Sequence, residues 1–148
     1  MKTFHRLCRE AYADISGEGA KRYGGRHNRI NERAVYAAEH LALALAELLV
    51  HLEKSDIPEG YVAIEIEVDE AHVAQMIAND PNNRPPAVLV PSVVVPKSYN
   101  LVIYPEAKNY AALNPASLKS NRLSSIRGCS QRRRRRNRST HPSNSSRA

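Results

Sequence analysis

Apolar and polar residues alternate from Tyr61 to Val68, where the apolar residues are separated by Glu65 and Glu67. This period of two predicts a half-buried strand. The short run Ala34–Tyr36 predicts another strand. Two further apolar runs interrupted by prolines, Ala87–Val95 and Leu101–Tyr104, predict strands as well.

Other segments have the spacing of helices. Phe4–Ile15 carries apolar residues at helical intervals, although its start also suits a short strand. Glu39–Lys54 is almost wholly apolar and predicts a buried helix. Asp69 is suited to cap a third helix that runs to about Ala78. The segments Ser16–Arg33 and Asp56–Gly60 are expected to be a loop and a turn.

Glu47 is an isolated acid within the apolar Glu39–Lys54 helix. On a helical wheel the apolar residues form two nearly opposite stripes, and Glu47 falls beside the stripe of Leu43 and Val50. A carboxylate inside a buried helix is costly unless it is paired or hydrogen-bonded. Buried acids gather at active sites, but structural ion pairs bury acids too, so both interpretations stay open.

A glycine-rich segment, Tyr23-Gly24-Gly25-Arg26-His27-Asn28, precedes this helix. Its glycines allow the backbone to approach a ligand closely, and the Arg26 guanidinium could hold a pyrophosphate or a ribose edge by forked hydrogen bonds. The alternative is a solvated loop arginine. Tyr36, at the end of a predicted strand, could stack on a base or a nicotinamide ring, or could simply be core.

Three blocks of this sequence resemble the RES-domain proteins, which are the toxins of RES–Xre toxin–antitoxin pairs. The blocks are SGEGAKRYGGRHN, AVYAAEHLALALAELLVHL and VPSVVVPKSYNLVIYP, and the resemblance spans roughly residues 4–106. The family is named for an Arg, a Glu and a Ser, which match Arg26, Glu47 and Ser92. Tyr36 matches a Tyr that the family also uses.

The resemblance implies a compact single α/β (α+β) domain similar to ADP-ribosyltransferase toxins. It implies NAD+ as substrate rather than as cofactor, with the nicotinamide–ribose bond broken by water (glycohydrolase) or phosphate (phosphorylase). Glu47 would stabilise positive charge on the ribose and Arg26 would grip phosphate or ribose oxygens. Tyr36, Ser92 and Tyr23 complete the expected substrate-binding set, with Tyr36 against the substrate ring and Ser92 hydrogen-bonded to ribose or phosphate.

The sequence departs from the family pattern at several positions. His27 stands where the family usually has Trp, and Ala37 follows Tyr36 where the family usually has Thr. The connection over residues 79–86 is shorter than in the family. These departures keep a second hypothesis open, in which the chain is a catalytically inactive, truncated RES relic that at most binds an Xre-type antitoxin.

The charge divides the chain into two parts. Residues 1–118 hold 12 Lys and Arg against 15 Asp and Glu, whereas residues 119–148 hold 10 basic residues and no acid. We therefore expect a RES-like domain over 1–118 and a disordered Arg/Ser-rich tail over 119–148. The run Arg132–Arg136 could contact nucleic acid non-specifically, which makes a nucleic-acid-binding protein the third hypothesis. The alternative for the tail is a non-functional extension.

The remaining chemistry-bearing residues give few signals. Cys8 and Cys129 offer neither a disulfide framework nor metal spacing, and the six histidines form no metal-binding motif. We therefore expect no metal site. No apolar run is long enough to span a membrane and no signal-peptide pattern is present, so the expected location is the cytoplasm, without membrane contact. The sequence leaves open whether water, phosphate or a protein is the acceptor.

Overall fold

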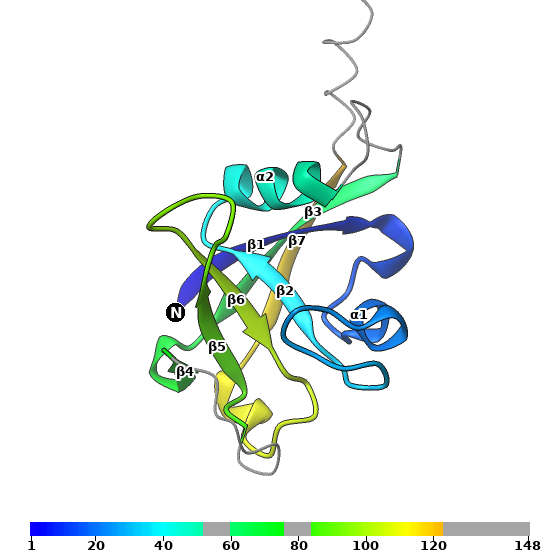
Figure 1. Cartoon of the computed structure of the whole chain (residues 1–148). Helices are drawn as coiled ribbons and strands as arrows, with labels where there is room; N and C mark the ends of the chain where they lie inside the picture. The colour runs from blue at the N-terminus through cyan, green and yellow to red at the C-terminus, as the bar shows by residue number, and fades with distance from the viewer. Residues whose placement is uncertain (52–59, 76–83, 123–148) are drawn as a thin grey trace, which may run out of the picture.

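The computed structural model describes residues 1–51, 60–75 and 84–122, which form a mixed α/β fold around one sheet (Figure 1). The seven strands follow the order β4-β5-β6-β2-β1-β3-β7. They are β1 (Lys2–Arg9), β2 (Val35–Ala38), β3 (Tyr61–Val68), β4 (Val73–Ala74), β5 (Ala87–Pro91), β6 (Tyr99–Ile103) and β7 (Ala116–Arg122). β4 and β5 are parallel, and the other neighbouring pairs are antiparallel. The expected α/β (α+β) fold is confirmed.

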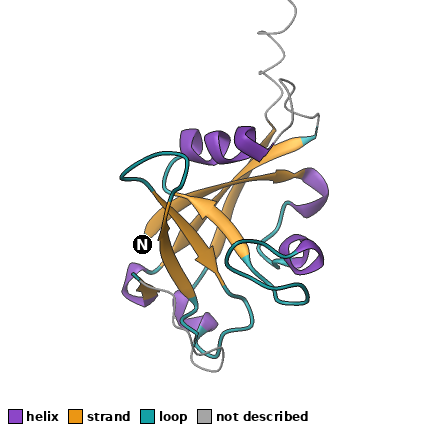
Figure 2. Ribbon diagram, viewed as in Figure 1, coloured by secondary structure: helices purple, strands orange, loops and turns teal. Residues whose placement is uncertain are grey.

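The helices are short and lie around the sheet (Figure 2). They are α1 (Glu18–Tyr23), α2 (Leu41–His51) and the 3₁₀ turns η1 (Glu10–Tyr12), η2 (Glu70–His72) and η4 (Tyr110–Leu113). In Figure 1, α2 lies across one end of the sheet and α1 lies beside β2. No helix in the described ranges is long and apolar enough to cross a membrane.

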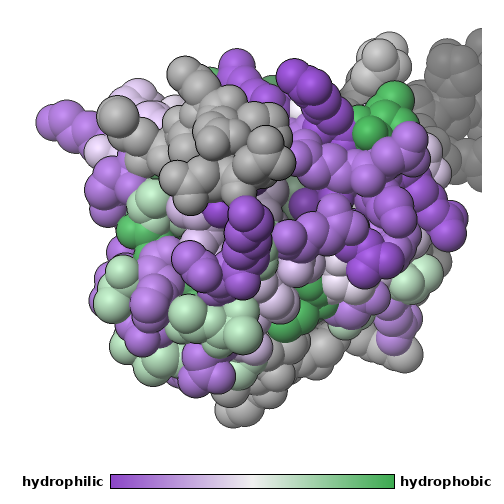
Figure 3. All heavy atoms as spheres, turned by 90° about the horizontal axis from the view of Figure 1, so that it is seen from below, coloured by the Kyte–Doolittle hydropathy of each residue, from purple (hydrophilic) through white to green (hydrophobic). Residues whose placement is uncertain are grey.

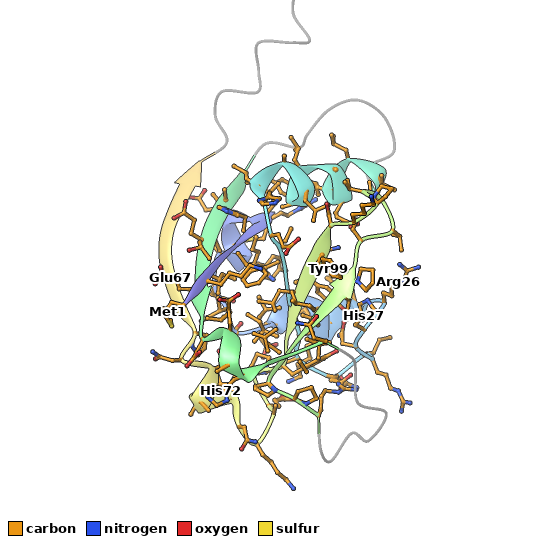
Figure 4. All side chains as sticks on the ribbon, turned by 90° about the vertical axis from the view of Figure 1, so that its left-hand side faces the viewer. Met1, Arg26, His27, Glu67, His72 and Tyr99 are labelled. Carbon is orange, nitrogen blue, oxygen red and sulfur yellow. The ribbon has the colours of Figure 1, made fainter. Side chains whose placement is uncertain are left out.

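β1 and β2 share a single register pair, His5 with Ala38, so the two halves of the sheet are joined by little pairing. As Figure 4 shows, β1, β3 and β7 lie on one side of the molecule and β5 and β6 on the other, with α2 across the end. The largest core cluster draws on both halves of the sheet. Its fully buried members include Phe4, Val35, Ile64, Ile66, Leu101 and Ile103.

The first segment differs from the helix expected over Phe4–Ile15. It forms β1, which pairs with β3 along its whole length, followed by η1. Phe4, Arg6 and Cys8 are the buried residues of β1, so the burial has a period of two. An arginine at a buried position disguised that alternation in the sequence.

The prediction for Asp69 was only half right. Its carboxylate accepts a hydrogen bond from the Ala71 backbone N–H at 3.0 Å, as a capping residue does. The capped element is the three-residue turn η2, and β4 follows directly, so no helix begins here. The predicted helix end at Ala78 lies outside the described residues. The loop expected over Ser16–Arg33 also contains the short helix α1.

The other predicted elements correspond to real ones, with shifted ends. β2, β3, β5 and β6 confirm the four predicted strands. α2 confirms the predicted helix but not its complete burial. Leu43 and Ala44 are buried against the sheet, whereas Leu49 and Val50 are 47% and 65% exposed. The apolar residues near the C-terminal end of α2 are therefore partly open to solvent.

The two ends of the molecule differ in surface character. Mostly hydrophilic residues cover the end opposite α2, with small apolar patches between them (Figure 3). At the α2 end, Leu49 and Val50 are exposed, as is Val93 after β5. The C-terminal strand β7 runs to Arg122, so the domain end expected after Leu118 falls inside a strand that pairs with β3. The rest of the tail, 123–148, lies outside the described residues.

Candidate functional site

A cavity of about 690 Å³ is lined by residues of α2, of strands β1, β2, β5 and β6, and of the loop after α1. Its polar wall consists of His5, Arg26, His27, Tyr36, Glu47 and Asn100. Its apolar wall includes Leu7, Ala38, Ala44, Leu48, Val90 and Val93. A mostly apolar cavity with a few convergent polar groups is the usual form of a small-molecule site, and this volume falls within the usual range. The cavity therefore joins three residues that the sequence singled out, namely Arg26, Tyr36 and Glu47.

The Glu47 carboxylate is held by two side chains from the β5–β6 hairpin. Its Oε1 accepts hydrogen bonds from Ser92 Oγ and Asn100 Nδ2, each at 2.7 Å. Glu47 reaches this position because Leu43, one helical turn earlier, is buried against the sheet. Both of these donors are neutral groups that orient the carboxylate oxygen.

Ser92 has other partners than expected. Its Oγ accepts hydrogen bonds from the backbone N–H groups of Val94 and Val95, at 3.1 and 3.0 Å, which leaves its proton for Glu47. Its own backbone N–H donates to the Ser98 carbonyl at 2.8 Å. Ser92 is not among the cavity-lining residues. The structure therefore shows Ser92 hydrogen-bonded to Glu47, and its expected contact with ribose or phosphate stays a prediction.

The loop that carries Arg26 is fixed by Asn28 and Tyr36. The Tyr36 hydroxyl donates to Asn28 Oδ1 at 2.7 Å and accepts from the His27 backbone N–H at 3.0 Å. Asn28 is buried, and its Nδ2 lies within hydrogen-bonding distance of three backbone carbonyls of the same loop region. Burial raises the pKa of Tyr36, so the phenol keeps its proton and donates at neutral pH.

Arg26 and His27 stand side by side at the cavity edge (Figure 4). Arg26 is exposed and has no ion-pair partner within the described part of the chain. The pKa of His27 is lowered, chiefly by burial and then by the positive charge of Arg26. At neutral pH this edge therefore presents one guanidinium cation beside a neutral imidazole.

Tyr23 does not join the site. Its side chain is 77% exposed on α1, and it is not among the cavity-lining residues, although Gly24 and Gly25 are. The short helix α1 ends at Tyr23, and Gly24 has a φ of 70°, which turns the chain before it reaches the cavity.

An ionic cluster whose residues are not among those lining the cavity contacts the same loop. Arg84 pairs with Glu32 and lies 4.4 Å above the centre of the Tyr104 ring. The Tyr104 hydroxyl donates to the His27 carbonyl at 2.9 Å, and burial raises the pKa of Tyr104 to about 12. Arg33 pairs with Glu18 on α1. The backbone N–H of His27 is therefore held by Tyr36 and its carbonyl by Tyr104.

Sequence reasoning missed Asn28, Asn100 and His5. Asn28 was part of the quoted glycine-rich segment but carried no assigned role. Asn100 lies on β6, where it is a polar residue next to an apolar run, and this is the available signal. His5 lies on β1 among several other polar residues, so no such signal marks it. Among the described residues, no group of three or more His, Cys, Asp or Glu side chains could hold a metal ion.

Comparisons with known proteins agree on one family. The family model described as RES domain matches residues 3–85, more than half of the chain. The Prs ADP-ribosylating toxin of Sphingobium sp. (strain YBL2) is 36% identical over 127 residues, covering 67% of this chain and 79% of that protein. A Toxin Res of Photorhabdus laumondii subsp. laumondii is 29% identical over 130 residues, covering 72% and 83%.

A solved structure has the same fold. The toxin–antitoxin complex MbcT-MbcA of M. tuberculosis contains a chain that superposes with a TM-score of 0.56, covering 82% of this chain and 84% of that one. The sequence identity is 19%, so this likeness concerns the fold alone.

Proposed function

This chain belongs to the RES-domain family, and on that premise we propose that it is the toxin of a toxin–antitoxin pair and breaks the nicotinamide–ribose bond of NAD+. The observation that carries the proposal is one cavity of about 690 Å³ that is lined by Arg26, Tyr36 and Glu47. Relatives named as toxins support the toxin assignment. They do not favour an inactive relic, because this chain spans 79% and 83% of two of those proteins.

The chemistry follows from charge. Nicotinamide leaves NAD+ with the electron pair of the C–N bond, and positive charge develops on the ribose carbon and ring oxygen, as in glycoside hydrolysis. A carboxylate fixed near that carbon stabilises the transition state more than the ground state, which is the requirement for catalysis. Glu47 has this role in our proposal. An oxygen of water or phosphate then forms the new bond to the ribose carbon, and a water acceptor releases its proton.

The other cavity residues bind the substrate in this proposal. Arg26, exposed at the cavity edge, offers a planar fork of donors to the pyrophosphate. The Tyr36 ring faces the cavity while its hydroxyl is engaged by the loop, so its contribution to the substrate is the ring surface. The apolar wall below α2 suits an aromatic ring of the dinucleotide.

The name of one relative favours a second candidate function. The Sphingobium protein is an ADP-ribosylating toxin. In such a reaction a protein side chain replaces water or phosphate as the acceptor, and the same C–N bond breaks. Both candidate functions predict release of nicotinamide. They differ in the acceptor to which ADP-ribose is transferred: water or phosphate in the first, a protein side chain in the second.

The partner in this proposal is an antitoxin of the Xre helix-turn-helix type. A chain of the same fold is known from a toxin–antitoxin complex, and RES toxins are paired with such proteins in the resemblance described above. The gene should have a short helix-turn-helix neighbour, and co-expression of that neighbour should relieve any growth arrest that this chain causes.

Product analysis tests the proposal directly. The purified protein is incubated with NAD+ in phosphate-free buffer, in phosphate buffer, and with a cell lysate. Mass spectrometry then identifies free ADP-ribose, its phosphorylated form, or ADP-ribose on protein. Nicotinamide release in none of the three conditions would contradict the proposal, and the arm that gives product identifies the acceptor.

A further inference from the structure

Asn100, a hydrogen-bond partner of Glu47, lies on a strand that is paired on both edges. It lies on β6, and its backbone is paired with Ala38 of β2 on one side and Val90 of β5 on the other. Its neighbours Leu101 and Tyr99 are buried and exposed, respectively. Pairing on both edges holds the backbone of Asn100 in place. Asn100 is therefore a fixed point relative to the cavity.

The hydrogen bonds of Asn100 and Ser92 converge on one atom. Asn100 Nδ2 and Ser92 Oγ both lie 2.7 Å from Glu47 Oε1. Ser92 is itself held by two backbone N–H groups, and its backbone is tied to Ser98 across the hairpin. A glutamate side chain has three rotatable bonds, and two rigid donors on one oxygen select a single arrangement. The hairpin thus fixes a carboxylate that belongs to a different element, α2.

The chemical type of the donors matters as much as their position. A lysine or arginine at position 100 would hold the carboxylate equally well but would offset its negative charge. A primary amide donates a hydrogen bond and carries no charge. Asn100 and Ser92 therefore orient the carboxylate without adding a positive charge of their own beside it.

We propose that Asn100 is a positioning residue that holds the Glu47 carboxylate toward the cavity, in concert with Ser92. The inference rests on the proposed function for its catalytic consequence. Its structural part, a Glu47 rotamer set by Asn100, stands without any substrate. Asn100 lines the cavity, whereas Ser92 does not.

The test uses two variants of the full chain and one matched control. Asn100→Asp keeps the shape of the side chain but replaces the donor by an oxygen that repels Glu47. Asn100→Ala removes the donor with less disturbance, in case the first variant does not fold. Asn109→Asp makes the same chemical change at an exposed position before η4. Thermal unfolding identifies variants that remain folded.

The first readout is turnover of NAD+. Displacing a reacting group by a short distance costs about 100-fold in rate, so both Asn100 variants should lower kcat by about that factor. KM should stay within about threefold, because the substrate-binding residues are unchanged. Asn109→Asp should behave as wild type. A role in stability alone would lower the unfolding temperature and leave kcat of the folded protein unchanged, which would overturn the proposal.

The second readout needs no substrate. Side-chain coupling constants of Glu47, measured by NMR, should report one rotamer in the wild type and in Asn109→Asp, and rotamer averaging in Asn100→Ala. An unchanged Glu47 rotamer in Asn100→Ala would overturn the proposal. A third outcome separates the two proposals. If the wild type does not cleave NAD+ but Asn100→Ala shows rotamer averaging of Glu47, the proposed function is contradicted and the positioning role is supported.

Discussion

A Cβ atom added at Gly25 would lie 2.6 Å from the Tyr36 hydroxyl oxygen, closer than side chains tolerate. It would also lie 2.7 Å from Asn28 Oδ1, the acceptor of the same hydroxyl. Gly25 is not in the positive-φ region, so space rather than backbone conformation requires glycine here. The second glycine of the YGGRHN segment thus allows Tyr36 to lie under the loop and to fix the backbone beside Arg26.

Gly25→Ala should therefore destabilise the protein. The clash falls on a partly buried tyrosine that packs against the core, and we expect a loss of about 1–3 kcal/mol in the free energy of unfolding. Gly19→Ala is the matched control, because its Cβ would meet nothing closer than Tyr12 at 3.9 Å. That change, within α1, should be neutral or slightly stabilising. Equal denaturation midpoints for the two variants would contradict the packing argument.

Arg26→Lys should weaken binding of NAD+ more than it slows the chemical step. An ammonium is a point donor and cannot reproduce the planar fork of a guanidinium, so we expect KM to rise about tenfold with kcat changed less. Arg29→Lys, at an exposed position outside the cavity lining, serves as the control. Steady-state kinetics of both variants give the comparison. Unchanged KM and kcat in Arg26→Lys would identify Arg26 as a solvated loop residue.

Tyr104 should make stability sensitive to alkaline pH. Its pKa is raised to about 12 in the folded protein against about 10 in an unfolded chain. Above pH 10 the unfolded state therefore binds fewer protons than the folded state, and the free energy of unfolding falls as pH rises. The contribution is fully present below pH 10 and is lost as pH rises through 12, by about 2–3 kcal/mol.

The Tyr104→Phe variant isolates this contribution. It loses the hydrogen bond to the His27 carbonyl, so it should be less stable at pH 7 by about 1 kcal/mol. Its free energy of unfolding should then decline less steeply between pH 10 and 12 than that of the wild type. Chemical denaturation at a series of pH values gives both curves. Parallel curves would show that the phenol of Tyr104 is not protected from titration.

Removal of the tail tests whether NAD+ cleavage and DNA binding depend on different parts of the chain. Residues 123–148 carry eight arginines and no acid, whereas all the cavity residues precede them. Truncation after Arg122, where β7 ends, should leave NAD+ cleavage unchanged and abolish binding to DNA. Binding by the full chain should fall steeply with added salt, with a slope in log K against log salt of about −0.9 per phosphate contacted. Salt-resistant DNA binding by the truncated chain would contradict this division.

The sequence predicts a strand best where apolar residues alternate with charged ones. In the second half of β3, Glu65 and Glu67 alternate with buried isoleucine and valine, so the period of two is clear. In β1 the buried Arg6 interrupts the same alternation, and helical spacing of the remaining apolar residues misleads. Asp69 was correctly predicted to cap a helical element. A capping residue does not determine whether a three-residue turn or a long helix follows it. The pairing of β4 with β5 decides between them, and that contact is not local in sequence.

In the candidate site too, residues within local motifs could be predicted from the sequence, whereas contacts between distant residues could not. Arg26, Tyr36 and Glu47 are found through motif and resemblance, and the fold brings them to one cavity. Their roles remain predictions. Ser92 was expected to contact the substrate, and that role stays a prediction. Its hydrogen bond to Glu47 joins residues 45 positions apart in the sequence and was not predicted. Asn100 lies 53 residues from Glu47 and belongs to no local motif.

The most direct measurement of the central claim is NAD+ turnover by wild type and by Glu47→Gln. Glutamine keeps an oxygen that can accept from Ser92 and Asn100, so the variant should fold, while the negative charge that acts in the transition state is lost. We predict nicotinamide release by the wild type and a fall in kcat of at least about 100-fold in Glu47→Gln, with KM changed far less. Near-normal turnover in the folded variant, or no nicotinamide release by the wild type, would contradict the account.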